Sequence, residues 1–393
     1  MPASTLLSDV KIADMSTVIF GPYCTQTLAD MGADVVKIEP AKGDDFRNVG
    51  KSAKTRHMGP GHMMLNRGKR SVVWDLKSEQ GKQAVRALIA ESDVFIHNVR
   101  AGAIDRLGLD FEAVKAIKPD IVYVHCVGFG SDGPYAGRPA YDDLIQGLSG
   151  AASLLPKVDG NPAPRFLPTA FADKVSGLHA AYATLAALHH RDRTGEPVHV
   201  EVPMFEAITH FLLEEHFYEA LYDPPVGPFC YQRQVDPSRQ PLQTKDGYIV
   251  IAPYTDPRWV RLFDVLNAAH ELEDDRLSDY RGRYFNMAYM LERVQHYLPK
   301  QTNAHWLAAF SKADIPAAPV NDFPDLQSDP HLQATGFFKR RDHPTEGPYW
   351  ETQPPVRFHG VAEKQITPAR LIGEDTEAVL AQLGLAEPTP LSE

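Results

Sequence analysis

Short apolar segments and amphipathic segments alternate along the first two hundred or so residues of the chain. An apolar run ends at Gly21, an amphipathic stretch covers residues 23–31, and a second apolar run follows over residues 34–39. Pro22 suits the first position of a helix, and Gly32 suits the left-handed residue that follows the last turn. The segment therefore predicts a strand, a helix and a second strand.

The same unit recurs further along the chain. Ser78 can cap a helix over residues 79–91 before an apolar run at 93–97, and Asp110 can cap a helix over residues 111–117. Alternation of this kind predicts right-handed βαβ crossovers and a mostly parallel sheet covered by helices on both faces. In such folds, ligands bind beyond the carboxyl ends of the strands.

The pattern changes in the second half of the chain. A long helix is expected over residues 174–190, and a Pro-rich segment at 223–228 follows a further strand and helix. Beyond it lie a short strand and helices rich in charged and aromatic residues, which indicate a second, smaller domain. We predict a large Rossmann-like α/β domain over residues 1–205 completed by 340–393, a linker over 206–230, a small α+β domain over 231–322, and a return linker over 323–339.

Length and charge limit the possible partners. The 393 residues fit two domains, and 40 Lys and Arg against 51 Asp and Glu give a net charge of −11, which disfavours nucleic acid as a partner. No apolar stretch of about 18 residues and no basic, apolar leader is present, so we expect no membrane partner and a cytoplasmic protein. The three cysteines are too few for a disulfide framework or a paired-thiolate zinc site.

The first strand–helix–strand unit does not fit a dinucleotide-binding fingerprint. Its turn supplies one glycine where three are needed, and Pro22 removes an N–H that would face the pyrophosphate. A metal site is also not expected. His210, Glu214 and His216 could be proposed as ligands, but on a predicted helix they fit a solvated face better.

The basic segment 66–71, Asn-Arg-Gly-Lys-Arg-Ser, precedes a predicted strand in an otherwise acidic protein. It could bind phosphates, or it could be a solvated basic loop. Lys37, Lys42 and Arg47 follow the second strand, and a sheet that brought them near Arg67 would offset several phosphate charges. Such a site would suit coenzyme A.

Motifs spread over almost the whole chain resemble the family III CoA-transferases, the group of formyl-CoA transferase, the carnitine CoA-transferases and the α-methylacyl-CoA racemases. The motifs lie at residues 21–26, 28–40, 66–71, 105–109, 128–130, 133–135, 172–173, 244–248, 316–320, 329–331 and 373–376. Together they are highly specific, although each alone would be weak.

The resemblance implies that Asp173 is the catalytic nucleophile, which takes the acyl group as a mixed anhydride and then CoA as an aspartyl thioester. From the residues alone, Asp173 could instead be only the N-cap of the long helix. A carboxylate with its ordinary pKa near 3.9 is ionised at neutral pH and needs no general base. CoA would then be part of the substrate, with no permanently bound cofactor, and the partners would be an acyl-CoA and a carboxylic acid.

The resemblance also implies a CoA site and a substrate pocket. The CoA-binding positions would be Thr17, Val18, Ile19, Lys37, Arg67, Lys69, Arg70, Asn98, Val99 and Arg106. The acyl pocket could be lined by Tyr141, Gln146, Arg165 and His179, with Arg165 pairing a second carboxylate or forming an ordinary surface ion pair. Residues 97–102 depart from the Glu-Asn-Phe-Gly-Pro-Gly segment of formyl-CoA transferase and the glycine-rich lid loop is missing, so formate and oxalate are not the expected substrates.

Two other functions stay open from the sequence. The racemase branch of the family exchanges the proton next to the thioester with a His–Asp pair, but its histidine is matched here by Tyr141, whose phenol is a poor base at neutral pH. His125 or His179 could replace it, although such histidines are more often packed residues. A non-catalytic relative that binds CoA esters would not need Asp173. The resemblance further implies an interlocked homodimer.

Overall fold

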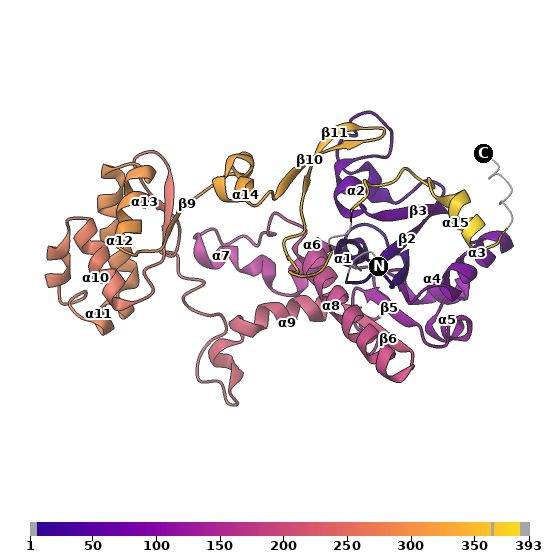
Figure 1. Cartoon of the computed structure of the whole chain (residues 1–393). Helices are drawn as coiled ribbons and strands as arrows, with labels where there is room; N and C mark the ends of the chain where they lie inside the picture. Colours follow the sequence, from indigo (N-terminus) through magenta and orange to yellow (C-terminus); the bar gives the residue numbers. More distant parts are fainter. Residues whose placement is uncertain (1–5, 363–364, 386–393) are drawn as a thin grey trace. The chain divides into compact units, whose positions relative to one another are not determined.

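The computed structural model describes residues 6–362 and 365–385 and divides into two compact units (Figure 1). The large unit comprises Met1–Ala152, Phe166–Glu214 and Gly336–Glu393. The small unit comprises Ser153–Arg165 and Glu215–Thr335. No helix of the described residues is long and apolar enough to cross a membrane.

A six-stranded parallel sheet forms the centre of the large unit, which confirms the predicted fold class. In spatial order the strands are β3 (Lys69–Val73), β2 (Asp34–Glu39), β1 (Lys11–Met15), β4 (Val94–His97), β5 (Val122–Val127) and β6 (Val198–Pro203). From β1 the chain builds the sheet outward in one direction to β2 and β3, and then returns to add β4, β5 and β6 on the other side of β1. The strand order therefore reverses between β1 and β4. In open parallel sheets a crevice forms beyond the carboxyl ends of such a strand pair. The segments that follow β1 and β4 therefore flank the expected ligand site.

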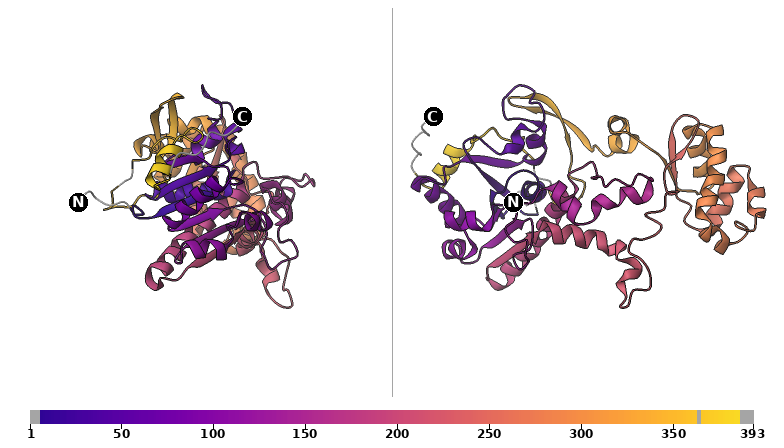
Figure 2. Two further views of the ribbon diagram at one scale, coloured as in Figure 1. Left: turned by 90° about the vertical axis from the view of Figure 1, so that its right-hand side faces the viewer. Right: turned by 180° about the vertical axis from the view of Figure 1, so that it is seen from behind.

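Helices cover both faces of this sheet (Figure 2). The helices that lie wholly or mostly in the large unit are α1 (Phe20–Asp30), α2 (Pro60–Leu65), α3 (Glu79–Ala90), α4 (Ala101–Leu107), α5 (Phe111–Ile117), α6 (Asp142–Leu148), α8 (Phe171–Thr194), α9 (Met204–His216) and α15 (Thr376–Gln382). The predicted caps are confirmed, because the side chain of Ser78 accepts from the N–H of Gly81 and that of Asp110 accepts from the N–H of Ala113. One core joins α3, α5 and α15 to the sheet, and α1 packs against α8.

Helix α1 begins earlier than the sequence pattern indicated. Its first residue is Phe20, so Pro22 is the third helical residue rather than the first. The first N–H groups of a helix have no intrahelical partner, so a proline costs no hydrogen bond at this position. As a result the first turn of α1 comes directly after the short segment that leaves β1.

The C-terminal segment returns to the large unit. Strands β10 (Phe338–His343) and β11 (Gly347–Thr352) pair in antiparallel orientation. Next to α15, the carboxylate of Asp375 accepts from the N–H of Ser71 at 2.9 Å, and the hydroxyl of Thr376 accepts from the N–H of Val73 at 3.0 Å. These bonds satisfy the outer edge of β3, which would otherwise expose unpaired backbone groups.

The small unit has α+β architecture. Its antiparallel sheet has the order β7 (Leu242–Gln243), β8 (Tyr248–Ile251) and β9 (Ala317–Pro319). Its helices are α7 (Leu155–Val158), α10 (Asp256–Val265), α11 (Tyr280–Phe285), α12 (Met287–Tyr297), α13 (Asn303–Lys312) and α14 (Pro330–Ala334). Buried Phe263, Met290 and Phe310 belong to a core of its own.

Short 3-10 turns occur in both units. They cover Asp45–Asn48, Ala151–Ser153, Tyr218–Leu221, Ala269–Glu273, Leu298–Lys300 and Phe323–Ser328.

Candidate active site

Asp173 is the third residue of α8, and another side chain caps this helix. The N-cap position is Ala170, which makes no side-chain capping bond. Instead, the Oδ1 atom of Asp142, at the start of α6, accepts from the N–H of Ala172 at 2.7 Å and from the N–H of Asp173 at 3.1 Å. The interpretation of Asp173 as only a helix cap is therefore wrong, and its carboxylate is not used to cap α8.

Gln146 holds Asp142 in this capping position. Its Nε2 donates to the Oδ2 of Asp142 at 2.6 Å, and its Oε1 accepts from the N–H of Leu167 at 2.8 Å. The side chain is fully buried. Gln146 thus ties α6 to the segment that leads into α8, and lining an acyl pocket would require it to leave these partners.

The surroundings of Asp173 disfavour its charged form. Burial and the nearby negative charge of Asp142 raise the pKa of Asp173 to about 7, while the backbone N–H of Phe20 acts in the opposite direction as a hydrogen-bond donor. The carboxyl is thus about half ionised at neutral pH. The expectation of full ionisation fails because it used the pKa of a solvated side chain. A carboxylate with this pKa is also more basic, and hence a better nucleophile, than an ordinary one.

Two glycines allow close packing around the N-terminus of α1: Gly177 against α8, and Gly21 against Ser16, which precedes the helix. A Cβ atom at Gly177 would lie 2.9 Å from the carbonyl oxygen of Phe20 and 3.0 Å from the Cβ of Tyr23. A Cβ atom at Gly21 would lie 2.2 Å from the Cβ of Ser16. Real Cβ atoms do not approach so closely, so both positions require glycine for this packing. The close approach is what places the N–H of Phe20 beside Asp173.

Gly177→Ala is expected to push α8 away from α1 and to lower kcat/KM by about tenfold or more for a reaction that uses the Asp173 carboxyl, since small misplacements of reacting groups are costly. Stability should fall by about 1–3 kcal/mol because the helices are overpacked. Steady-state kinetics and thermal unfolding measure the two effects. Gly147→Ala on α6 is the matched control, because the added Cβ meets open space. Equal activity of the two variants would contradict the role given to the close approach.

The segment that follows β1 and the segment that follows β4 are joined at the expected ligand crevice. Asn98 Oδ1 accepts from the N–H of Thr17 at 3.0 Å, and its Nδ2 donates to the C=O of Thr17 at 2.9 Å. Val18 and Ile19 follow in the chain, and the N–H of Val99 donates to a ring nitrogen of His97. Of the predicted CoA-binding positions, the structure brings Thr17 and Asn98 into contact, and Arg106 lies exposed on the adjacent helix α4.

Four of the five predicted basic residues of the CoA site, all except Arg106, have partners inside the large unit. Lys37 and Lys69 are 1% and 2% exposed. Lys37 pairs with Asp44 at 3.0 Å, and the Nζ of Lys69 donates to the C=O of Pro22 and to Asn66, each at 3.0 Å. Arg67 pairs with Asp30 at 2.7 Å, and Arg70 pairs with Asp34 at 2.6 Å. A phosphate would therefore have to share each of these cations with a carboxylate or a backbone carbonyl.

The predicted substrate residues are in different settings. Tyr141 is 65% exposed and directly precedes Asp142. The Nδ1 of His179, on α8, is 2.9 Å from the carbonyl oxygen of Val175. Arg165 belongs to the small unit, where it pairs with Asp159 at 2.5 Å, as the surface-pair alternative expected. Tyr141 and His179 thus share the large unit with Asp173.

Two histidines of the large unit are packed against each other. The rings of His97 and His125 stack with centroids 4.3 Å apart, and burial lowers the pKa of both. The Nε2 of His125 lies 2.9 Å from the carbonyl oxygen of Val99. His125 is thus a packed residue that supports the segment after β4. Among the described residues, no group of three or more His, Cys, Asp or Glu is arranged to hold a metal ion.

Sequence reasoning missed the residues that act on Asp173 from other segments. Asp142, Gly177 and the N–H of Phe20 carry no local signal for this role, because each depends on where two distant helices meet. The pairing of Asp142 with a helix that begins some thirty residues later could only have been suspected from the uncapped start of that helix. Its N-cap position is an alanine.

Comparisons with known proteins identify the family of the chain. The family described as CoA-transferase family III matches residues 7–376. The chain is 31% identical over 399 residues to succinate–glutarate CoA-transferase of Agrobacterium fabrum, covering 98% of this chain and 97% of the relative. It is 28% identical to formyl-CoA:oxalate CoA-transferase of Escherichia coli, covering 98% and 97%. The crystal structure of a CAIB/BAIF family protein from Brucella suis aligns with a TM-score of 0.83 at 31% identity, covering 96% of this chain and 99% of the other.

Proposed function

Because the chain belongs to CoA-transferase family III, we propose that it transfers CoA from an acyl-CoA thioester to a carboxylic acid through covalent intermediates on Asp173. The observation that carries this proposal is the state of the Asp173 carboxyl. Asp142 caps α8, so the Asp173 carboxyl does not have to. The pKa of this carboxyl is raised to about 7, and it faces the backbone N–H of Phe20. Buried carboxyls with perturbed pKa values are candidates for chemical roles.

The proposed reaction proceeds by acyl exchange at one carboxyl group. An oxygen of Asp173 attacks the thioester carbonyl, the C–S bond breaks, and CoA leaves as a thiolate, giving a mixed anhydride. The thiolate attacks the aspartyl carbonyl and releases the donor acid, which leaves an aspartyl-CoA thioester. The acceptor carboxylate then attacks that thioester and frees the thiolate. Attack of the thiolate on the acceptor's carbonyl forms the new CoA ester and restores Asp173.

The negative charge of Asp142 favours the covalent states in this scheme. Ionised Asp173 is repelled by Asp142, and acylation or thioester formation removes the charge from Asp173. The repulsion therefore exists in the free enzyme and is relieved in each covalent intermediate, which is a form of ground-state destabilisation. The N–H of Phe20 can donate to the oxygen that becomes negative during attack.

We place the nucleotide end of CoA at the carboxyl ends of β1 and β4. The contacting positions would be Thr17, Val18, Ile19, Asn98, Val99 and Arg106, and the sheet topology supports this placement. Arg67 and Arg70 remain proposed phosphate contacts that would share their charge with Asp30 and Asp34. Tyr141, His179 and Arg165 remain proposed for the acyl pocket, with a homodimer completing the site. Exposed apolar residues of α6 and α8, Leu144, Leu148, Leu178 and Tyr182, support a partner surface on the large unit.

A panel of acyl-CoAs and carboxylic acids tests this function, with dicarboxylates such as succinate and glutarate first because a relative is named for them. New CoA esters are expected in the presence of a suitable acid, and the peptide that contains Asp173 is expected to carry the mass of CoA when the reaction is stopped by acid. Both products are measured by mass spectrometry. Deuterium entering the carbon next to the thioester, without exchange between acids, would support the racemase alternative instead.

A further inference from the structure

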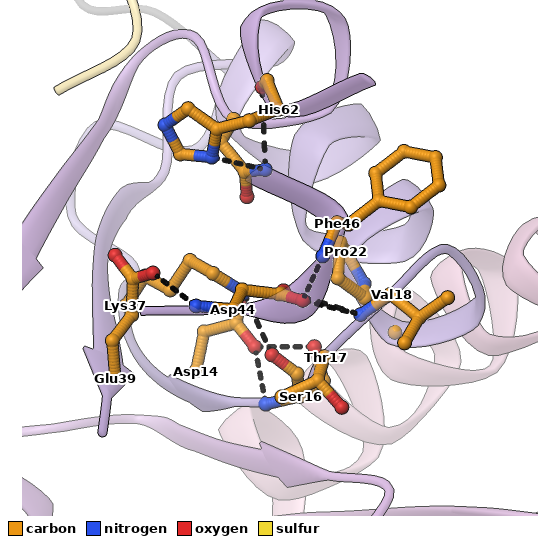
Figure 3. A network of polar contacts seen from close by, with 12 residues as sticks. Asp14, Ser16, Thr17, Val18, Pro22, Lys37, Glu39, Asp44, Phe46 and His62 are labelled. Atoms are coloured by element: carbon orange, nitrogen blue, oxygen red, sulfur yellow. Dashed lines mark hydrogen bonds and ion pairs between the residues drawn. The ribbon is translucent and has the colours of Figure 1, made fainter. Parts of the chain in front are cut away.

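Side chains from several elements hold the backbone of residues 16–19, the turn that joins β1 to α1 (Figure 3). We call this segment the 16–19 turn. The contacts are the N–H of Ser16 to Asp14 (2.9 Å), the C=O of Ser16 to Lys37 (2.7 Å), the N–H and C=O of Thr17 to Asn98 (3.0 and 2.9 Å), and the N–H of Val18 to both oxygens of Asp44 (3.2 and 3.1 Å). A turn whose main-chain groups are held this way is specified by its surroundings rather than by its own sequence.

Val18 adopts a conformation that its side chain disfavours. Its φ is 68°, in the left-handed region, which is a genuine outlier for a β-branched residue. Strain of this kind persists only where the surrounding structure fixes it, and it concentrates at functional sites. Here the N–H of Val18 is fixed by Asp44, while its side chain is 37% exposed. The strained residue therefore faces outward and its anchor lies inside.

The anchor is a buried ion pair. The Nζ of Lys37 lies 3.0 Å from the Oδ2 of Asp44, and the two side chains are 2% and 0% exposed. Burial lowers the pKa of Lys37, but Asp44, Asp14 and Glu39 outweigh this effect and raise it overall, so the lysine stays charged. Two apolar side chains would satisfy the core equally well. They could not bind the C=O of Ser16 and the N–H of Val18.

We propose that Lys37 and Asp44 are a positioning pair that holds the 16–19 turn in the shape that receives CoA, and that neither side chain contacts the ligand. This inference rests on the proposed placement of CoA at the turn. It replaces the expectation that Lys37 binds a phosphate, because the Nζ of Lys37 already donates to Ser16 and pairs with Asp44. The turn also leads directly into Phe20, whose N–H faces Asp173.

Equilibrium binding of CoA and of 3′-dephospho-CoA, measured by calorimetry, tests the proposal. Lys37→Met should weaken both ligands by the same factor, about tenfold or more, since each must now order the turn on binding. The double variant Lys37→Met/Asp44→Asn should bind both ligands better than Lys37→Met alone. The Asn side chain keeps an acceptor for the N–H of Val18 and leaves no unpaired buried carboxylate.

Arg283→Met, in the small unit, is the control for the loss of a buried cation. Arg283 is 5% exposed, and its guanidinium donates to the carboxylate of Asp256 at 2.7 Å and to the C=O of Leu277. It should lose stability, measured by thermal unfolding, with nearly unchanged affinity for CoA. A selective loss of CoA over its dephospho form in Lys37→Met would make Lys37 a phosphate ligand. Unchanged affinity of Lys37→Met for both ligands would mean that the ion pair only stabilises the fold. Each of these two outcomes would overturn the proposal. The readout is binding, so it does not depend on chemistry at Asp173.

Discussion

Asp173→Asn is expected to abolish CoA exchange, with kcat lowered by at least about a thousandfold, because the amide cannot form the anhydride or the thioester. The change is nearly isosteric, and the N–H of residue 173 still donates to Asp142. The CoA-linked peptide should disappear together with the activity. Steady-state kinetics and mass spectrometry of the acid-stopped reaction measure both losses.

The same variant should be more stable than the native protein at alkaline pH. The pKa of Asp173 is raised from its ordinary value to about 7, so the folded state resists ionisation that the unfolded chain undergoes near pH 4. Between about pH 4 and pH 7 the unfolded chain loses the proton of Asp173 more readily than the folded protein does, so the free energy of unfolding falls as pH rises. Above that range the carboxyl is ionised in both states and the loss stays constant. Removing it should gain on the order of 2 kcal/mol at pH 8, after allowance for solvent screening, and little at pH 4.

Thermal unfolding at the two pH values separates a chemical role from a structural one. Loss of activity with unchanged or raised stability identifies Asp173 as a reacting group, whereas loss of both would mean that the variant is misfolded. A variant that kept full exchange would refute the nucleophile assignment and leave CoA transfer without a mechanism on this chain.

The parts of the fold that the sequence predicted are those determined locally. The strands of the large unit are apolar runs, and the side chains of Ser78 and Asp110 each accept from the N–H group three residues later in their own helix. Asp173 was found through resemblance, because motifs around it span the chain. Local pattern alone favoured the helix-cap interpretation, which the structure contradicts.

The charge pattern of the sequence did not show the long-range ion pairs of the basic cluster. Arg67 and Arg70 read as a phosphate-binding cluster, yet Asp30 and Asp34, more than thirty residues earlier, neutralise them. A parallel sheet places β2 beside β3, so residues distant in sequence become neighbours in ways that no local window shows. A cluster of like charges in a sequence says nothing of its partners, and the same limit hid the role of Asp44 beneath the 16–19 turn.

The pH dependence of exchange should report the repulsion between Asp142 and Asp173. In the native protein kcat/KM should rise with pH through about 7 as Asp173 ionises, since only the carboxylate attacks. Asp142→Asn keeps an acceptor for the N–H groups of Ala172 and Asp173 but removes the charge. The midpoint should therefore move down by about one unit, and the rate above it should fall because the carboxylate is less basic.

Two measurements distinguish the loss of the Asp142 charge from a purely structural effect of Asp142→Asn. Asn at position 142 loses one bond to Gln146, so a loss of about 1 kcal/mol in stability is expected, and thermal unfolding measures it. A structural effect would lower the rate equally at every pH, whereas the loss of a charge displaces the profile. Asp143→Asn, on the exposed next position of α6, removes the same charge without contacting α8 and should leave the midpoint in place. If Asp142→Asn left the midpoint where it is in the native protein, burial alone would set the pKa of Asp173, and the relief of repulsion could not favour the covalent intermediates.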